Sequence, residues 1–375
     1  MNDRKQKLGF YCSSNSFGGL ELHMVRLASW MQERGWATLL YVIADSQMAI
    51  EGKRLGLTLR PIKRNRKYFD ISAASRISRA FKRDNIDIVW LRDKRDLSVA
   101  GIAKSLSGSK IKLVYQQAME LGVAKRDVFH TIRFRKLDAW LTSLPYLGDQ
   151  VIANTKFPKD RIHIVPLGLE LNKFTNGTLS KSEARNQLQL PEDAIIIGNI
   201  GRFGPGKQQD LLIKGLDLIR KSGKNVHILL MGENTRNEGD AFLNALQNLI
   251  ENLGLEESVH FRPFREDVLG FYRSIDIFAL SSKKETYGMV TIEAMASGLP
   301  IVATDSGGTK EILNSGEFGM LYDPNSAEEF ADKINLLLDD ADKMRSIGAL
   351  ARKEAMDNYS HETECQRIEQ IISIL

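Results

Sequence analysis

The chain of 375 residues is too long for a single compact core and fits two domains of ordinary size. Its hydrophobic content of 43% and charged content of 26% are typical of a globular protein, and no apolar run approaches the roughly 18 to 20 residues of a membrane-spanning helix. The two cysteines, Cys12 and Cys365, lie far apart without metal-ligand spacing, and the N-terminal residues lack a signal-peptide core. We therefore expect a cytoplasmic protein with reduced thiols and no metal site.

The first half of the chain alternates short apolar runs with longer amphipathic stretches. Short apolar or period-two runs predict strands, and apolar residues three or four positions apart predict helices. The predicted strands are residues 8–12, 37–43, 57–61, 86–91, 111–116, 139–143 and 162–166. Predicted helices between them include residues 20–34, 72–84 and 125–136.

A glycine pair, Gly18 and Gly19, precedes Glu21 in the turn after the first predicted strand. Glycine at a strand-to-helix turn lets the backbone approach a ligand closely. Because many parallel-sheet folds carry glycines at this place, the pair alone is weak evidence for a ligand-binding turn.

Charge is distributed unevenly along the chain. Residues 1–170 contain 30 lysines and arginines against 16 aspartates and glutamates, a net charge of +14, and the remainder contains 22 against 31, a net charge of −9. The densest basic run is residues 60–69. A domain this basic is expected to approach an anionic membrane surface or an anionic acceptor. No basic motif with interleaved aromatics matches a nucleic-acid module, so nucleic acid is not an expected partner.

The second half repeats the alternation after a connector at residues 165–172. Its predicted strands are residues 194–200, 226–231, 259–261, 275–280, 301–304 and 319–322, and its predicted helices are residues 207–222, 240–253, 288–297 and 327–339. Strict alternation implies parallel sheets with helices on both faces. We therefore predict an α/β protein of two Rossmann-like parallel-sheet domains facing each other across a cleft. The predicted domains are residues 1–170 and 171–357, with a terminal helix at 358–375 that returns to the first domain.

A cluster of glycines and cations follows the first strand of the second half. Gly201, Arg202, Gly204 and Gly206 lead into Lys207, at the start of a predicted helix. The spacing matches neither the dinucleotide fingerprint nor the Walker A motif. The two cations could neutralise a diphosphate that the glycine backbone approaches.

Two carboxylates, Glu285 and Glu293, flank a short stretch around Gly288 between two predicted strands. The backbone N–H groups of Gly288, Met289 and Val290 would open the following helix, where partial positive charge favours a phosphate. Carboxylates beside a phosphate are explained if they accept hydrogen bonds from sugar hydroxyls at the two ends of one ligand. The alternative interpretation is a solvated loop acid and a helix-start acid, which are common.

Together these motifs resemble family-4 glycosyltransferases, retaining enzymes with the GT-B fold that use nucleotide-sugar donors. The resemblance runs from Gly18, Gly19 and Glu21 through residues 166–168, Arg202, Lys207 and residues 231–233 to residues 285–300. The acid pair with its trailing helix end is the specific part of this signature. The glycine turns are less specific.

This resemblance implies roles by position. Arg202 and Lys207 would hold the diphosphate and stabilise it as the leaving group, and Glu285 would bind the donor sugar. Glu293 would bind the ribose, and the backbone around Phe264 would contact the base. No metal cofactor is expected, and the first domain would bind the acceptor.

One departure from the family pattern concerns the loop after the strand at residues 111–116. Many relatives carry a histidine there that contacts the donor sugar, whereas this chain has no histidine around Ala118. Gln117 or Glu120 could serve the sugar hydroxyls instead. His130 falls within a predicted helix and is interpreted as structural.

The predicted function is transfer of a sugar from a nucleotide diphosphate to a hydroxyl acceptor with retained configuration. The basic first domain favours a glycan or glycolipid acceptor, as in lipopolysaccharide or other cell-surface polysaccharide synthesis, at the inner face of the cell membrane. A nucleotide-sugar epimerase, which needs no separate acceptor, is one alternative. The second alternative is a degenerate transferase that acts as a binding protein and transfers no sugar.

Overall fold

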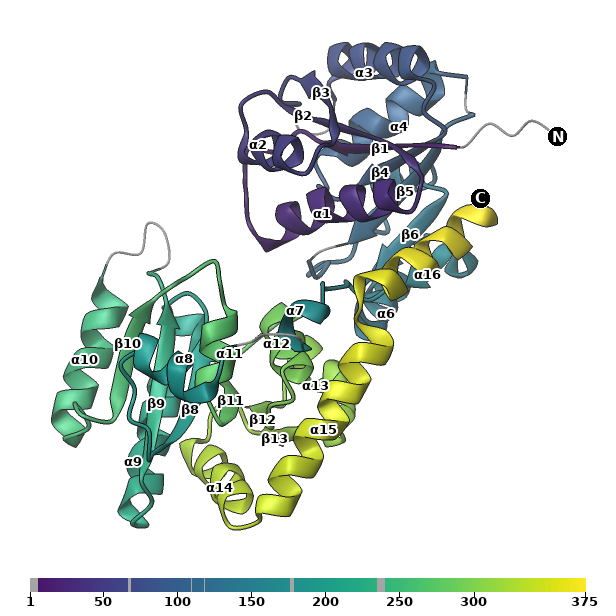
Figure 1. Cartoon of the computed structure of the whole chain (residues 1–375). Coiled ribbons are helices and arrows are strands. Elements are labelled where there is room, and N and C mark those ends of the chain that lie inside the picture. Colours follow the sequence, from purple (N-terminus) through teal and green to yellow (C-terminus); the bar gives the residue numbers. More distant parts are fainter. Residues whose placement is uncertain (1–5, 67–68, 109, 118, 176–178, 235–239) are drawn as a thin grey trace. The chain divides into compact units, whose positions relative to one another are not determined.

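The computed structural model describes residues 6–66, 69–108, 110–117, 119–175, 179–234 and 240–375 (Figure 1). The chain divides into two compact units. The first comprises Met1–Gly168 and His361–Leu375, and the second comprises Leu169–Ser360. The boundaries predicted after residues 170 and 357 lie close to these limits.

The first unit contains a parallel sheet with seven strands among its described residues, in the order β3-β2-β1-β4-β5-β6-β7. The strands are β1 (Lys7–Cys12), β2 (Ala37–Ile43), β3 (Thr58–Ile62), β4 (Ile88–Leu91), β5 (Lys112–Gln117), β6 (Ala139–Thr142) and β7 (Ile162–Ile164). The helices are α1 (Gly19–Glu33), α2 (Gln47–Arg54), α3 (Ile71–Asp84), α4 (Asp96–Leu106), α5 (Val128–Phe134) and α6 (Pro145–Asn154), with a 3₁₀ turn η1 (Lys159–Arg161).

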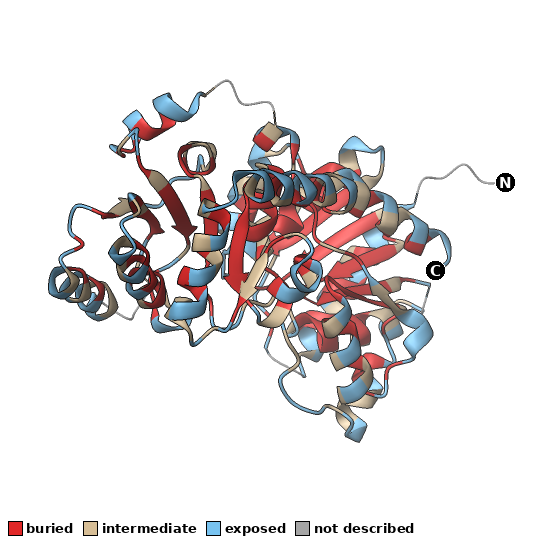
Figure 2. Cartoon of the chain, turned by 90° about the horizontal axis from the view of Figure 1, so that it is seen from below, coloured by how far each residue is buried: buried red, intermediate tan, exposed pale blue. Residues whose placement is uncertain are grey.

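Helices cover both faces of this sheet, which explains why its strands read as continuous apolar runs. On β1, Phe10 packs into the core beneath α1 and α2, and its neighbour Tyr11 packs into the core beneath α3 and α4. Both residues are fully buried. Figure 2 shows the buried residues concentrated on the strands and the exposed residues on the outer helix faces.

The second unit contains a parallel sheet with six strands among its described residues, in the order β10-β9-β8-β11-β12-β13. The strands are β8 (Ile195–Ile200), β9 (Val226–Gly232), β10 (Val259–Pro263), β11 (Ile277–Leu280), β12 (Ile301–Thr304) and β13 (Met320–Tyr322). The helices are α7 (Asn172–Thr175), α8 (Lys181–Gln187), α9 (Gln209–Lys221), α10 (Ala241–Leu253), α11 (Leu269–Ser274), α12 (Met289–Ala296), α13 (Gly307–Ile312), α14 (Ala327–Leu338) and α15 (Ala341–Asn358), with 3₁₀ turns η2 (Pro205–Lys207) and η3 (Asn314–Gly316). The predicted α/β class with two Rossmann-like parallel sheets is confirmed.

The last helix, α16 (His361–Ser373), belongs to the first unit and packs against α1 (Figure 1). Arg34 at the end of α1 donates two hydrogen bonds to Glu369, from Nε at 3.0 Å and from Nη2 at 2.6 Å. The indole N–H of Trp36 donates to the same carboxylate at 3.0 Å. These contacts fix the C-terminal helix on the unit that contains the N-terminal strand.

Among the helices that the structure describes, none combines the length and hydropathy of a bilayer span.

Candidate active site

The loops that follow β8 and β11 meet at the carboxyl edge of the second sheet, because these strands are hydrogen-bonded neighbours. The strand order reverses between them, which is the place where open parallel sheets bind ligands. The N–H of Lys283 donates to the Gly206 carbonyl at 3.0 Å, and the Ser281 hydroxyl donates to the Lys207 carbonyl at 2.6 Å. The predicted glycine turn and the predicted acidic stretch therefore form one continuous surface.

Lys207 and Glu285 are paired at this surface. The Lys207 Nζ lies 2.7 Å from Glu285 Oε2 and donates a second hydrogen bond to the Ser282 hydroxyl at 3.2 Å. The side chains are 35% and 20% exposed. The cation assigned to the diphosphate and the carboxylate assigned to the sugar thus lie in direct contact and neutralise each other.

The backbone of Glu285 is held by the start of α13. The Gly308 N–H donates to the Glu285 carbonyl at 2.8 Å. Gly307 has φ +54°, and a Cβ at this position would lie 2.3 Å from the same carbonyl oxygen. The sequence pattern did not predict this contact, although Gly307 and Gly308 stand at a strand-to-helix turn, as Gly18 and Gly201 do.

Helix α12 starts beside this pair. Its N-cap, Gly288, adopts the left-handed conformation (φ +83°, ψ 58°), and a Cβ there would lie 3.2 Å from Glu285 Cγ. As a glycine, Gly288 offers no side chain to cap the helix. The amides of Met289 and Val290 therefore open the helix without an N-cap side-chain acceptor, and such a helix start attracts an anion.

Glu293 lies on the same helix and is oriented by Tyr272 of α11. The Tyr272 hydroxyl donates to Glu293 Oε2 at 2.7 Å and lies 3.2 Å from the Val290 carbonyl oxygen. Burial and the neighbouring Glu293 charge raise the pKa of Tyr272 well above its usual value, so the phenol remains a donor. Nothing in the sequence pattern identified Tyr272, because its role depends on the packing of α11 against the adjoining elements.

Arg202 lies on the same loop as Lys207, after β8, and Phe264 lies on the loop after β10. Arg202 follows β8, is exposed, and accepts a hydrogen bond through its carbonyl from Gln209 Nε2 at 3.1 Å. Phe264 follows β10 and is 48% exposed. The predicted donor site of the second unit therefore draws its residues from loops after β8, β10 and β11, and their ligand contacts stay predictions.

The predicted glycine turn of the first unit is open. Gly18 caps α1 with extended backbone, and its N–H donates to Glu21 Oε2 at 3.0 Å. A Cβ on Gly19 would meet no atom within 4 Å. The loop thus presents bare backbone at the carboxyl end of β1.

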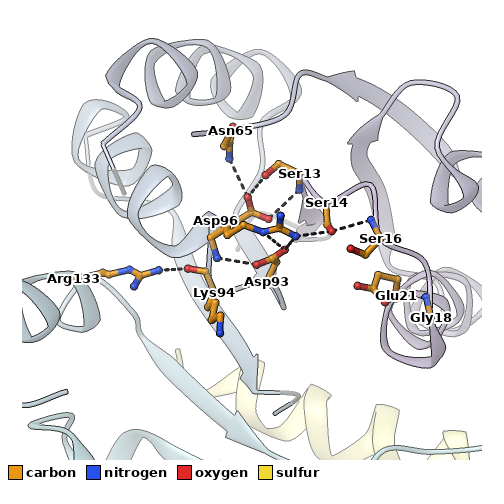
Figure 3. Close-up of polar contacts among 11 residues, drawn as sticks. Ser13, Ser14, Ser16, Gly18, Glu21, Asn65, Asp93, Lys94, Asp96 and Arg133 are labelled. Carbon is orange, nitrogen blue, oxygen red and sulfur yellow. Dashed lines mark hydrogen bonds and ion pairs between the residues drawn. The ribbon is translucent and has the colours of Figure 1, made fainter. Parts of the chain in front are cut away.

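A buried carboxyl, Asp96, joins the loops after β1, β3 and β4 (Figure 3). Its two oxygens accept from the Ser13 N–H at 3.0 Å, from the Ser13 hydroxyl at 2.5 Å and from Asn65 Nδ2 at 2.9 Å. Burial raises the pKa of Asp96 to about 7 despite these hydrogen bonds. Beside it, Arg95 donates to Asp93 at 2.9 and 2.7 Å and to the Ser14 hydroxyl at 2.7 Å.

A cavity of about 230 Å³ lies at the carboxyl ends of β1, β4 and β5 in the first unit, where its strand order also reverses. Both residues proposed to replace the family histidine, Gln117 and Glu120, line this cavity. The Gln117 amide is engaged at both ends, donating to the Met119 carbonyl and accepting from the Trp140 indole, each at 2.9 Å. Glu120 is the better placed of the two, since it is half-buried and the Tyr146 hydroxyl lies 3.5 Å from its Oε1.

Other predicted positions fall elsewhere. Ala118, where relatives carry the histidine, lies outside the described residues. His130 lies on α5 and pairs through Nδ1 with Asp127 Oδ2 at 2.6 Å, a contact at the N-cap of its own helix. Among the described residues, no group of three or more His, Cys, Asp or Glu side chains could hold a metal ion.

Residues 17–173 match a family model described as Glycosyltransferase Family 4, and residues 180–354 match one described as Glycosyl transferases group 1. The D-inositol 3-phosphate glycosyltransferase of Nocardia farcinica is 33% identical over 233 residues, which are 58% of this chain and 51% of that protein. The mannosylfructose-phosphate synthase of Agrobacterium fabrum is 31% identical over 218 residues, which are 56% of this chain and 47% of that protein. The chain thus spans about half the length of the curated relatives it matches.

The structure of Anabaena HepE in complex with UDP is similar over both units, with a TM-score of 0.85 and 22% identity, covering 99% of this chain and 100% of that one. This likeness shows a shared fold.

Proposed function

Because the chain belongs to the family-4 glycosyltransferases and has their GT-B fold, we propose that it moves a sugar from a nucleotide diphosphate to a hydroxyl acceptor. The observation that carries this proposal is the contact of Lys207 with Glu285 beside the uncapped start of α12. Cation, carboxylate and helix start together match a ligand in which a diphosphate adjoins sugar hydroxyls.

Donor binding in this proposal exchanges the partners of the ion pair. The diphosphate replaces Glu285 as the acceptor for Lys207, with Arg202 and the α12 amides as further donors. Glu285 is then released to accept a hydroxyl of the donor sugar, and Glu293, held by Tyr272, accepts the ribose hydroxyls. The same cations stabilise the departing diphosphate as its bond to the sugar breaks. The acceptor hydroxyl attacks from the face that the diphosphate leaves and passes its proton to the departing diphosphate oxygen, and attack from this face retains the anomeric configuration.

Uridine is the first donor nucleoside to test, because HepE was solved in complex with UDP. The two curated relatives are named for phosphorylated compounds, D-inositol 3-phosphate and mannosylfructose phosphate, so an acceptor screen includes sugar and polyol phosphates beside glycolipids and lipopolysaccharide precursors.

We also propose that the first unit docks on an anionic membrane, as a glycolipid acceptor would require. Before and within the first turns of α3, the basic side chains of Lys63, Arg64, Arg66 and Arg76 line a surface hollow together with Phe69 and Ile71. Phe69 and Ile71 are 71% and 68% exposed. Asp70 and Ser72 also line the hollow, but the four cations outnumber the one carboxylate. Exposed apolar side chains beside an excess of cations suit the boundary between headgroups and acyl chains. Lys67 and Tyr68 of the predicted basic run lie outside the described residues.

The donor test measures binding of UDP, GDP and ADP, free and as nucleotide sugars, by thermal shift and calorimetry. Glu293→Gln should weaken binding of the nucleotide sugar that the wild type selects by about tenfold or more, because the single amide oxygen can accept from Tyr272 or from the ribose but not from both. Glu328→Gln, at an exposed helix-start acid of α14 in the same unit, is the matched control. Equal affinity in wild type and Glu293→Gln would refute this site.

Product analysis separates the alternatives. Transfer with retained configuration, read from the anomeric proton of the product, supports the proposal. Conversion of the donor sugar without an acceptor would indicate an epimerase. Donor binding without transfer across the acceptor screen would indicate a binding protein.

A further inference from the structure

Arg92 follows β4 directly and lines the cavity of the first unit together with Arg133 of α5. The two arginines are only 6% and 9% exposed. A buried guanidinium is costly unless it is paired, so each calls for a partner.

One side of the Arg92 guanidinium is fixed by a relay of buried side chains. Arg92 Nη1 donates to His23 Nδ1 at 2.8 Å, and His23 Nε2 lies 2.9 Å from Glu364 Oε2 on α16. Burial lowers the pKa of His23. Because a guanidinium can only donate, His23 Nδ1 accepts from Arg92, and this leaves the ring proton on Nε2, toward Glu364. Glu364 is held in turn by the Gly168 N–H at 2.8 Å and by Gln116 Nε2 at 3.2 Å.

The other side of this guanidinium has no partner among the residues that the structure describes. Arg92 Nε and Nη2 are buried and make no hydrogen bond to any described residue. This Nε–Nη2 edge is the one that grips carboxylates elsewhere in the same protein, with Arg34 on Glu369 at 3.0 and 2.6 Å and Arg54 on Glu51 at 2.7 and 2.7 Å. In Arg92 the contact of Nη1 with His23 fixes the guanidinium, and the Nε–Nη2 edge has no acceptor among the described residues.

The charges around the cavity favour an anion on this edge. Four cations line it, Arg92, Lys94, Lys125 and Arg133, against three carboxylates, Glu21, Asp93 and Glu120. Asp93 is already paired with Arg95, which is not among the lining residues, and Glu21 accepts from the Gly18 N–H (Figure 3). Arg133 donates through Nη2 to the Lys94 carbonyl, which holds a second guanidinium beside the cavity.

We propose that this cavity binds an oxyanion, a phosphate or a carboxylate, carried by the acceptor, and that Arg92 grips it through Nε and Nη2. The inference rests on the proposed function in one respect, the assignment of the ligand as an acceptor. Two parallel N–H donors match two oxygens of one oxyanion, a geometry that lysine cannot reproduce. A volume of about 230 Å³ suits one sugar unit or less, so the charged group belongs to the acceptor residue that enters the cavity.

The test titrates inorganic phosphate, glucose 6-phosphate, glucuronate and glucose into the full chain by calorimetry. Saturating UDP is present, so that the phosphate-binding groups of the second unit are occupied. We expect the wild type to bind at least one of the anionic sugars more tightly than glucose. Tighter binding of glucose 6-phosphate identifies phosphate as the group, and tighter binding of glucuronate identifies a carboxylate.

Two variants of Arg92 and one control assign the binding. Arg92→Gln should lose about tenfold or more in affinity for the preferred anion. Arg92→Lys keeps the positive charge but loses the two parallel N–H donors, so it should also bind the anion more weakly than wild type. Arg54→Gln removes an arginine whose same edge already holds Glu51 on α2, and it should bind as wild type does.

Thermal midpoints separate this role from a structural one. If the open edge serves a ligand, the preferred anionic sugar should raise the thermal midpoint of wild type and leave that of Arg92→Gln unchanged, whatever the midpoint of the unliganded variant. Wild-type anion affinity in Arg92→Gln, or no preference for anionic sugars over glucose, would overturn the inference. Failure of UDP to bind would overturn only the proposed function, and the anion titrations would then be compared without UDP.

Discussion

A single methyl group at Gly307 should disable the donor site by displacing the backbone of Glu285, although no predicted ligand-binding side chain is removed. Gly307 has φ +54°, and its added Cβ would lie 2.3 Å from the carbonyl oxygen of Glu285. An ordinary contact needs about 3.5 Å, so the loop that carries Glu285 must move by about 1 Å. The movement also stretches the 2.8 Å hydrogen bond from the Gly308 N–H to the same oxygen.

The displacement of the Glu285 loop sets the expected loss of activity, and the strained backbone with its stretched hydrogen bond sets the expected loss of stability. A misplacement of about 1 Å at a catalytic group can lower kcat/KM by about 10²-fold, equivalent to about 2.7 kcal/mol. Alanine in the left-handed conformation costs about 1 to 2 kcal/mol of folding free energy, and the weakened hydrogen bond about 1 kcal/mol more. Gly307→Ala should therefore fold but turn over donor poorly.

Gly254→Ala is the matched control, because Gly254 has φ +64° at the end of α10 and open space around its Cβ position. The assay compares kcat/KM for the best donor and the free energy of unfolding in urea for both variants. Gly254→Ala should share the conformational cost and keep wild-type kcat/KM. If both variants lose kcat/KM equally, or if Gly307→Ala turns over like wild type, the positioning of Glu285 by α13 is refuted.

Three further predictions concern the surface and the titrating groups. The double variant Phe69→Ser, Ile71→Ser should abolish cosedimentation with phosphatidylglycerol vesicles. The control Ile50→Ser, at a 55% exposed apolar side chain of α2, should cosediment as wild type does. Equal loss of vesicle binding in both variants would contradict the docking surface. Burial lowers the pKa of His260 to about 4, below its unfolded value of about 6.5, so the folded state resists protonation and stability falls as pH drops through this window. His260→Gln should therefore lose less unfolding free energy than wild type between pH 7 and pH 4, and parallel urea-melt profiles would exclude this. Burial raises the pKa of Asp96 to about 7, above its unfolded value of about 3.9, so its stabilising contribution is fully present below about pH 3.9 and is lost as pH rises through 7. The loss of unfolding free energy caused by Asp96→Asn, measured by urea melts, should therefore be larger at pH 5 than at pH 8. A loss that does not depend on pH would show that Asp96 does not titrate in this range.

The strands were predictable because parallel strands that are buried on both faces appear in the sequence as continuous apolar runs. The runs at 37–43 and 301–304 coincide with β2 and β12. Helix ends depend on capping contacts: α3 starts at Ile71 because the Asp70 side chain accepts from the Ala73 N–H, whereas apolar periodicity alone indicated residue 72. The sequence pattern did not single out α15 (Ala341–Asn358), which has only a few buried residues.

The donor site was predictable in part, because its residues sit on loops directly after predicted strands. The carboxyl ends of parallel strands share one edge, so Lys207 and Glu285 were expected near each other before their 2.7 Å contact was seen. Tyr272 and Gly307 were not predicted, since neither carries a motif and each acts through a neighbour that only packing supplies.

The chain's own sequence determined the repeating strand and helix units, the two sheets and the edge at which each sheet presents its loops. These follow from local patterns that each segment carries within itself. Tertiary structure alone decided how distant residues pair, as in the contact of His23 with Glu364 across 341 positions, which orients Arg92. The physical reason is that a hydrogen bond between distant residues depends on strand order and helix docking, and no local periodicity encodes these.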